Sequence, residues 1–114
     1  MINNVVLVGR VCNEVNLFTN ENGYKAANIV LAVQRGFKNQ EDVYETDFID
    51  VKVTFMTAEI CAEYITKGSI IGIKGRLATK TLTIGDKKIN AIEMIGERVT
   101  FIHLLKKNEE VDAE

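Results

Sequence analysis

Phe48 is the residue whose type and position most clearly suggest a binding chemistry. It lies in residues 46–56, where apolar and polar side chains alternate at period two, as they do in a half-buried strand. The predicted core face carries Ile49, Val51, Val53 and Phe55, and the opposite face carries Phe48, Asp50, Lys52 and Thr54. A large ring on this polar, cation-bearing face has two explanations. Either a nucleobase stacks on it, since every base offers a π-face, or another subunit or a loop covers it.

A row of cations lies on a second predicted strand. Its even positions are Lys74, Arg76, Ala78, Lys80 and Leu82. Alternate residues of a strand are roughly 6–7 Å apart, which is close to the spacing of phosphates along an extended single strand of nucleic acid. The alternative is a solvated edge whose Lys and Arg side chains block aggregation. We favour contact with a nucleic acid, because Phe48, Lys52 and this row can lie on one surface of a small barrel.

The sequence offers little for catalysis or metal binding. The single histidine, His103, stands near the end of the last predicted strand with no Ser or Cys motif beside it. Cys12 and Cys61 are too few for a zinc cluster, and we expect Cys61 in the core. Asp47 and Asp50 are three residues apart on a strand and therefore point to opposite faces. We expect a protein that is not an enzyme and that has no metal or cofactor.

Length and composition indicate one domain with an uneven distribution of charge. The chain of 114 residues suffices for a single core, and no apolar run approaches the roughly 20 residues that span a bilayer. The N-terminus has no basic region or cleavage signal, so we expect a cytoplasmic protein without membrane contact. Residues 67–88 hold six cations and one carboxylate, whereas residues 41–63 hold seven carboxylates and one lysine. Such a basic segment fits a surface that binds a polyanion, and it fits a solvated surface as well.

The elements that must position these residues are mostly strands. Five segments have the composition of strands: residues 5–10, 27–34, 46–56, 70–83 and 88–104. Residues 57–66 instead show helical spacing, with Thr57 as a possible N-cap and Gly68 beyond the C-terminal end. Residues 36–42 are polar and predict a loop before the strand that contains Phe48.

This order predicts an all-β protein with the OB-fold, a five-stranded Greek-key barrel with one short helix between strands 3 and 4. Gly9, Gly72 and Gly75 lie within strands and suit the close contacts of a strongly curved barrel. An SH3-like barrel or a small α+β sheet would compete, and the position of the helix favours the OB-fold. We expect residues 1–106 to form this domain and the acidic residues 107–114 to be a short disordered tail.

Five motifs occur along the chain in a recognisable order and spacing. They are residues 1–10 (MINNVVLVGR), 31–37 (LAVQRGF), 46–50 (TDFID), 64–69 (YITKGS) and 72–77 (GIKGRL). Together they resemble the bacterial and phage-type single-stranded DNA-binding proteins, the SSB family, over residues 1–102. The resemblance implies an OB-fold that usually assembles as a homotetramer and wraps single-stranded DNA without sequence preference. It also implies a role in DNA replication, recombination or repair.

The resemblance further implies particular site residues. The family stacks bases on aromatic side chains at four recurring places, and Phe37 and Phe48 match two of these. The other two places fall on Thr54 and Leu82, where the family normally has an aromatic residue. Cations that contact the DNA backbone in the family match Arg10, Arg35, Lys74, Arg76 and Lys80. The argument from the strand face alone adds Lys52 to this set.

Departures from the family pattern change these expectations. The loss of two stacking residues should weaken binding or shift it towards phosphate contacts. Phe55 is not expected to replace Thr54, because its ring should face the core. The chain has no Trp, no Gly-rich linker and no Pro-Phe tip, so we do not expect it to recruit partner proteins through a C-terminal tip. Two other functions fit the same barrel: an OB-fold adaptor in a primosome or recombination complex, and an RNA-binding OB module.

Overall fold

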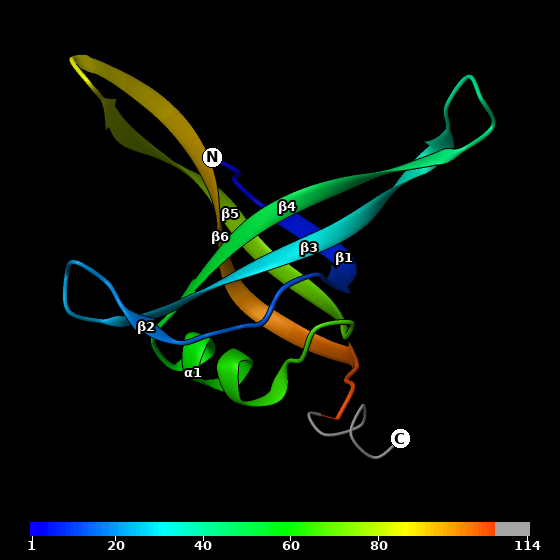
Figure 1. The fold of residues 1–114 in the computed structure, drawn as a ribbon, viewed down its shortest axis with the longest axis horizontal. Coiled ribbons are helices and arrows are strands. Elements are labelled where there is room, and N and C mark those ends of the chain that lie inside the picture. The colour runs from blue at the N-terminus through cyan, green and yellow to red at the C-terminus, as the bar shows by residue number, and fades with distance from the viewer. Residues whose placement is uncertain (107–114) are drawn as a thin grey trace.

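The computed structural model describes residues 1–106, whose strands close into a barrel with a helix at one end and hairpins that project from it (Figure 1). The elements are β1 (Val5–Val11), β2 (Phe18–Thr19), β3 (Lys25–Lys38), β4 (Tyr44–Thr54), α1 (Phe55–Tyr64), β5 (Ile70–Ile84) and β6 (Lys87–His103). The sheet has the order β1-β5-β6-β4-β3-β2, and pairing of β1 with β3 closes it. The short β2 lies outside the closed ring, so five strands form the barrel and α1 connects the third to the fourth. The predicted architecture is confirmed.

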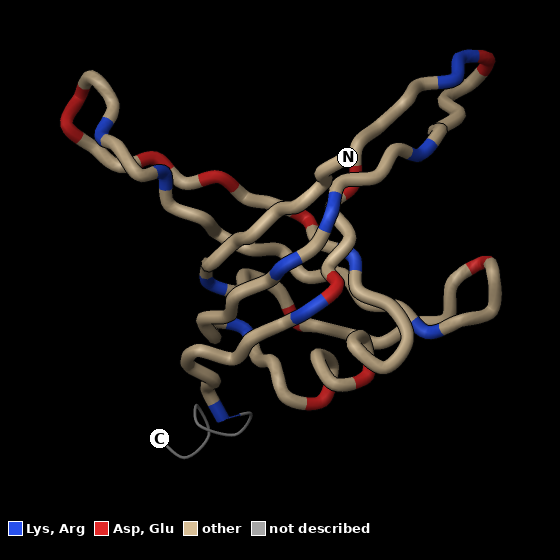
Figure 2. Tube along the Cα trace, turned by 180° about the vertical axis from the view of Figure 1, so that it is seen from behind, with Lys and Arg blue, Asp and Glu red and all other residues tan. Residues whose placement is uncertain are grey.

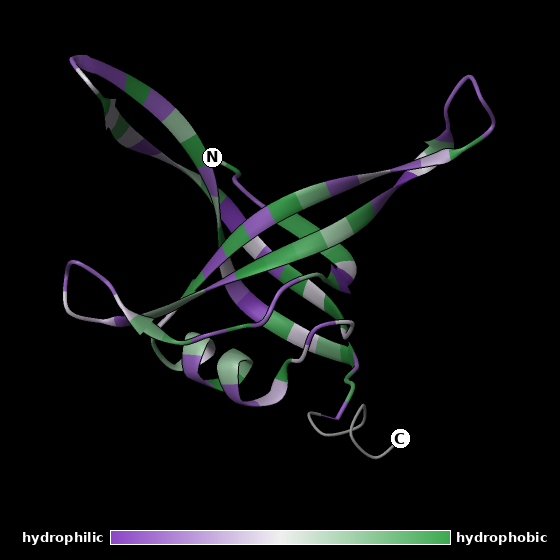
Figure 3. Ribbon diagram, viewed as in Figure 1, coloured by the Kyte–Doolittle hydropathy of each residue, from purple (hydrophilic) through white to green (hydrophobic). Residues whose placement is uncertain are grey.

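Figure 3 shows hydrophobic and hydrophilic residues alternating along parts of the strands. Such alternation points the apolar side chains to one face, and the buried ones form a single core cluster. Val51 and Val53 of β4 are fully buried, as are their β3 partners Ile29 and Ala27. Cys61 of α1 belongs to the same cluster, as predicted, and both cysteines are free thiols. Burial raises the pKa of the Cys61 thiol to about 11, which suits an inert structural cysteine.

The hairpin of β3 and β4 is longer than the sequence predicted. The predicted loop at residues 36–42 is wrong in its first part, because β3 continues to Lys38 before the chain turns. Asn39 stabilises the turn, since its Oδ1 accepts hydrogen bonds from the backbone N–H groups of Glu41 at 2.8 Å and Val43 at 3.0 Å. The sequence also gave no sign of β2, because two residues are too few to show a period.

The helix α1 begins earlier than predicted. Its N-cap is Thr54, not Thr57, and Thr54 makes no side-chain capping hydrogen bond. The helix therefore starts where β4 ends, and the side-chain signal of Thr57 has no part in it. The helix ends at Tyr64, so Gly68, with φ +96°, lies in the following turn and not at the helix end. The prediction that Phe55 faces the core is also wrong, because its side chain is 61% exposed.

Two of the three glycines predicted to make close contacts do so. A Cβ atom at Gly9 would lie 2.6 Å from the carbonyl oxygen of Ala32, and one at Gly75 would lie 1.8 Å from that of Ile95. A Cβ at Gly72 would make only ordinary contacts, the nearest at 3.7 Å. Within residues 1–106, no helix is long and apolar enough to cross a membrane. The predicted tail, residues 107–114, lies outside the described residues.

Candidate nucleic-acid interface

The outer face of the barrel exposes Phe48 close to a cation. Pairing of β3 with β4 sets Ala32 beside Phe48, and pairing of β1 with β3 sets Arg10 on the other side of Ala32. Phe48 is 69% exposed, and Arg10 is exposed as well. Arg10 Nη1 donates to the carbonyl oxygen of Gly68 at 2.9 Å, which uses one of the five N–H groups of the guanidinium. An exposed aromatic ring and an exposed cation thus flank one small residue.

The same face continues from β4 across β6 to β5. Lys52 of β4 pairs with Ile95 of β6, and Ile95 pairs with Arg76 of β5. An open groove at this place is lined by Asn28, Asp50, Val51, Lys52, Lys80, Ile92, Glu93 and Met94. The register therefore brings Lys52, Arg76 and Lys80 onto the surface that exposes Phe48, as the sequence predicted.

Carboxylates lie beside two of these cations. Lys80 Nζ is 3.4 Å from a carboxylate oxygen of Glu93, and Arg76 Nε is 3.5 Å from one of Glu97. Figure 2 shows the Lys and Arg residues of the β5–β6 hairpin in blue among acidic residues in red. Exposed ion pairs of this kind contribute only about 0–1 kcal/mol. A phosphate group can replace these carboxylates at small cost in free energy.

Arg98 is a further cation that the sequence reasoning missed. It lies on β6 directly opposite Lys74 of β5, and both side chains are exposed. Two like charges opposite each other destabilise an antiparallel pair, and a bound anion would relieve the repulsion. The register shifts between Lys74 and Gly75, so this pairing could not be deduced from the spacing of the residues.

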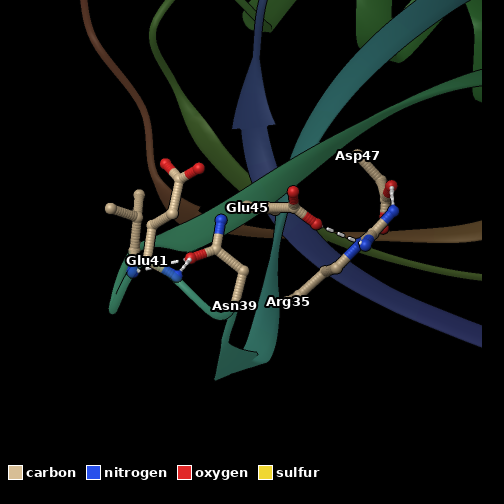
Figure 4. A network of polar contacts seen from close by, with 6 residues as sticks. Arg35, Asn39, Glu41, Glu45 and Asp47 are labelled. Carbon is tan, nitrogen blue, oxygen red and sulfur yellow. Dashed lines mark hydrogen bonds and ion pairs between the residues drawn. The ribbon is translucent and has the colours of Figure 1, made fainter.

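Arg35 is held by carboxylates instead of being open to a phosphate (Figure 4). Its Nη2 and Nε donate to the two carboxylate oxygens of Asp47 at 2.9 and 3.1 Å, and Nη1 donates to Glu45 at 2.6 Å. The hydrogen bond from Arg35 lowers the pKa of Asp47, and the same bond raises the pKa of Arg35. Asp47 pairs with Val33, whereas the next residue, Phe48, points to the opposite face of the β3–β4 ribbon. The structure does not bring Arg35 to the surface that exposes Phe48.

Replacing Asp47 with asparagine should remove the bidentate partner of Arg35 and one negative charge of the β3–β4 hairpin, while Glu45 stays paired with Arg35. We expect the Kd for a labelled oligo-dT to fall by about two- to fivefold at low salt, and the gain to shrink as salt rises. Fluorescence anisotropy at two salt concentrations measures both effects. Asp86→Asn, in the β5–β6 turn, makes the same change in charge and serves as the control. Equal gains for both variants would show that only the net charge matters.

Of the remaining predicted site residues, Phe37 and Leu82 lie on projecting hairpins, and Thr54 ends the face of β4 that carries Phe48. Phe37 is exposed near the end of β3, where the register with β4 shifts between Gln34 and Lys38. Leu82 is exposed on the β5–β6 hairpin. These two hairpins project from the barrel in different directions (Figure 1). Thr54 is half-buried at the start of α1.

Comparison with known proteins decides the family. The model of the Single-strand binding protein family matches residues 2–102. This chain belongs to that family. The Single-stranded DNA-binding protein of Halalkalibacterium halodurans is 39% identical over 103 residues, which cover 90% of this chain and 61% of that protein. Single-stranded DNA-binding protein 1 of Staphylococcus aureus is 33% identical over 110 residues, which cover 96% of this chain and 70% of that protein.

A solved structure of the SSB family shares the fold. It is described as a Plasmodium falciparum SSB complex with ssDNA. The superposition has a TM-score of 0.73, and the two sequences are 22% identical. The match covers 90% of this chain and 96% of that one. At this identity the likeness shows the fold, and it agrees with the predicted OB-fold. The chain spans about three fifths of the length of the relatives from Halalkalibacterium halodurans and Bacillus cereus, 61% in each case.

This SSB-family chain has an aromatic pair that was not among the predicted site residues. Phe55 stacks on Tyr24, with ring centroids 4.7 Å apart and an angle of 22° between the ring planes. The backbone of Phe55 has φ +55°, a conformation that costs a non-glycine residue roughly 1–3 kcal/mol. The sequence reasoning missed the pair because it extended the alternation of β4 one residue past the end of the strand.

Proposed function

We propose that this SSB-family chain binds single-stranded DNA without sequence preference, in DNA replication, recombination or repair. The observation that carries the proposal is the exposed Phe48 ring, with Arg10 across Ala32 on the same open face. An exposed ring accepts any base, and cations such as Lys52 and Arg76 supply contacts to phosphates. The names of the relatives support the same substrate. The proposed role is binding, and it assigns no catalytic step to the chain.

Fluorescence anisotropy with labelled oligo-dT, oligo-rU and duplex DNA at two salt concentrations tests this function. The label is required because the chain contains no Trp to report binding. We expect oligo-dT to bind more tightly than duplex DNA, and the affinity to fall as salt rises. Tighter binding of oligo-rU would favour an RNA-binding module, and no salt-dependent binding would favour a protein–protein adaptor. Duplex DNA that bound as tightly as oligo-dT would contradict the proposal.

We also propose that the chain forms a homo-oligomer, with a tetramer as the form that the family resemblance implies. An exposed apolar surface on β1, β5 and β6 supports this proposal. Val6, Val8 and Ile102 are all more than half exposed, and a Cβ at Gly72 would lie 3.7 Å from Val8 and 3.8 Å from Ile102. Contiguous exposed apolar side chains mark association surfaces, and a symmetric pair of copies can bury such a patch against itself.

Replacing Val8 with aspartate should weaken this association. A symmetric interface would receive the new charge from both copies, so we expect the dissociation constant of the oligomer to rise by about 100-fold or more. Sedimentation velocity over a range of concentrations measures the change. Val43→Asp is a matched control, because Val8 and Val43 are both 54% exposed and Val43 lies in the β3–β4 turn. Identical sedimentation of the Val8→Asp variant and the unaltered protein would exclude this surface as the interface.

A further inference from the structure

Two aromatic side chains outside the predicted site form a stack at the end of β4. Tyr24 directly precedes β3, and Phe55 is the first residue of α1. Their ring centroids are 4.7 Å apart, and their planes differ by 22°. Phe55 is 61% exposed, so Tyr24 covers part of its ring and much of the remainder is open to solvent. Figure 1 shows the hairpin between β2 and β3 beside the start of α1.

The backbone at Phe55 accounts for the position of its ring. Its φ of +55° lies in the left-handed region, where a bulky side chain is rare. This conformation interrupts the alternation of β4, which would have pointed residue 55 into the barrel with Val53. Glycine takes the same conformation freely, so a large ring here is not what the turn itself requires. Strained residues of this kind cluster at ligand sites.

The stack lies on the outer face of the barrel. Thr54 on this face pairs with Ala26, Phe55 follows Thr54 directly, and Tyr24 lies two residues before Ala26. Phe18 of β2 pairs with Ala26 from the other side, and Ala26 is fully buried. Two aromatic residues, Phe18 and Tyr24, therefore lie beside Ala26 at this end of the barrel.

The stack lies at the end of the strand that carries Phe48 and Lys52. The outer positions of β4 run from Phe48 through Lys52 to Thr54, a distance of about 20 Å at 3.3 Å per residue. A single strand that follows this line would meet Phe48 first, then Lys52, and then the stack. One OB-fold holds roughly 4–16 nucleotides, so both rings fit within the length of one bound segment.

We propose that Tyr24 and Phe55 form a base-stacking site, in which an unpaired nucleobase lies on the open face of the Phe55 ring and extends the stack. The proposal rests on the single-stranded DNA binding proposed above. It gives the chain an aromatic contact next to Thr54, where the sequence alone indicates that one is lost. Tyr24 supports the Phe55 ring from its other face and holds it parallel to the incoming base.

The variant Phe55→Gly separates binding from folding. Glycine adopts the left-handed backbone conformation without strain, which should stabilise the fold. Loss of the contact with Tyr24 should destabilise the fold by a similar amount, so the melting temperature should change little. The affinity for labelled oligo-dT should fall by about five- to tenfold, because one stacked base is lost. Phe55→Tyr keeps a ring and should keep the affinity. Tyr64→Ala is the matched control. Tyr64 is an exposed residue at the other end of α1, and its ring centroid lies 6.2 Å from that of Phe101. Its replacement removes a comparable aromatic contact and should leave the affinity unchanged.

Photo-crosslinking locates the base directly. Oligo-dT that carries 5-iododeoxyuridine is irradiated on the unaltered protein, and the adducts are mapped by mass spectrometry. We expect adducts on the peptides that contain Tyr24 or Phe55, in addition to the one that contains Phe48. Adducts confined to Phe48, with an unchanged affinity of Phe55→Gly, would overturn this inference and leave the proposed function standing. Failure of the unaltered protein to bind oligo-dT would instead overturn the proposed function.

Discussion

Replacing Phe48 with alanine should weaken the binding of oligo-dT by about 5- to 150-fold and leave the fold intact. Stacking of a base on an aromatic ring contributes about 1–3 kcal/mol, and each 1.4 kcal/mol changes Kd tenfold. The ring is 69% exposed, so its removal takes little packing from the core. Fluorescence anisotropy measures the affinity, and thermal unfolding followed by circular dichroism shows that the variant is folded.

Two further variants separate stacking from simple apolar contact at this position. Phe48→Tyr keeps the π-face and should bind as the unaltered protein does. Phe48→Leu keeps apolar surface without a π-face, and most of the loss seen with alanine should persist. A well-folded Phe48→Ala variant with unchanged affinity would contradict the stacking role. In that case an altered sedimentation coefficient would assign the ring to contact between subunits.

Alternation of residue types predicted the barrel because its strands are buried on one face only. Val51 and Val53 are buried and Phe48 is exposed, as the period of two required. The pattern worked for β4 up to Thr54 and then misled at Phe55. A strand pattern carries no information on the residue at which φ changes sign, and only that change turns the Phe55 ring outward.

The partners of the charged residues could not be predicted, because they depend on register. Arg35 meets Glu45 and Asp47, which lie 10 and 12 residues away, because β3 and β4 pair in a register that sets Val33 opposite Asp47 and Gln34 opposite Thr46. The sequence indicated strands at residues 27–34 and 46–56, which leave Arg35 and Glu45 outside both strands, and alternation within each strand does not fix the register between them. The cation row on β5 was visible in the sequence, since it needs only the alternation within one strand.

Replacing Gly75 with alanine should destabilise the barrel strongly. A Cβ at this position would lie 1.8 Å from the carbonyl oxygen of Ile95 and 2.9 Å from its carbonyl carbon. Both atoms belong to the backbone of β6, so no side-chain rotation can relieve the clash. We expect the free energy of unfolding to fall by about 3 kcal/mol or more, measured by urea denaturation.

Gly36→Ala is the control for this prediction, because a Cβ there would meet nothing within 4 Å. Its free energy of unfolding should stay within about 0.5 kcal/mol of that of the unaltered protein. Gly75 lies at the β5–β6 register shift, next to Arg76, which pairs with Ile95. Ile95 also pairs with Lys52 of β4. The Gly75→Ala variant could stay folded if β5 and β6 separate locally. Its affinity for oligo-dT should then fall as well, because Arg76 would move away from Lys52. A Gly75→Ala variant with unchanged stability and unchanged affinity would contradict this prediction. It would show that the register shift between β5 and β6 does not require glycine.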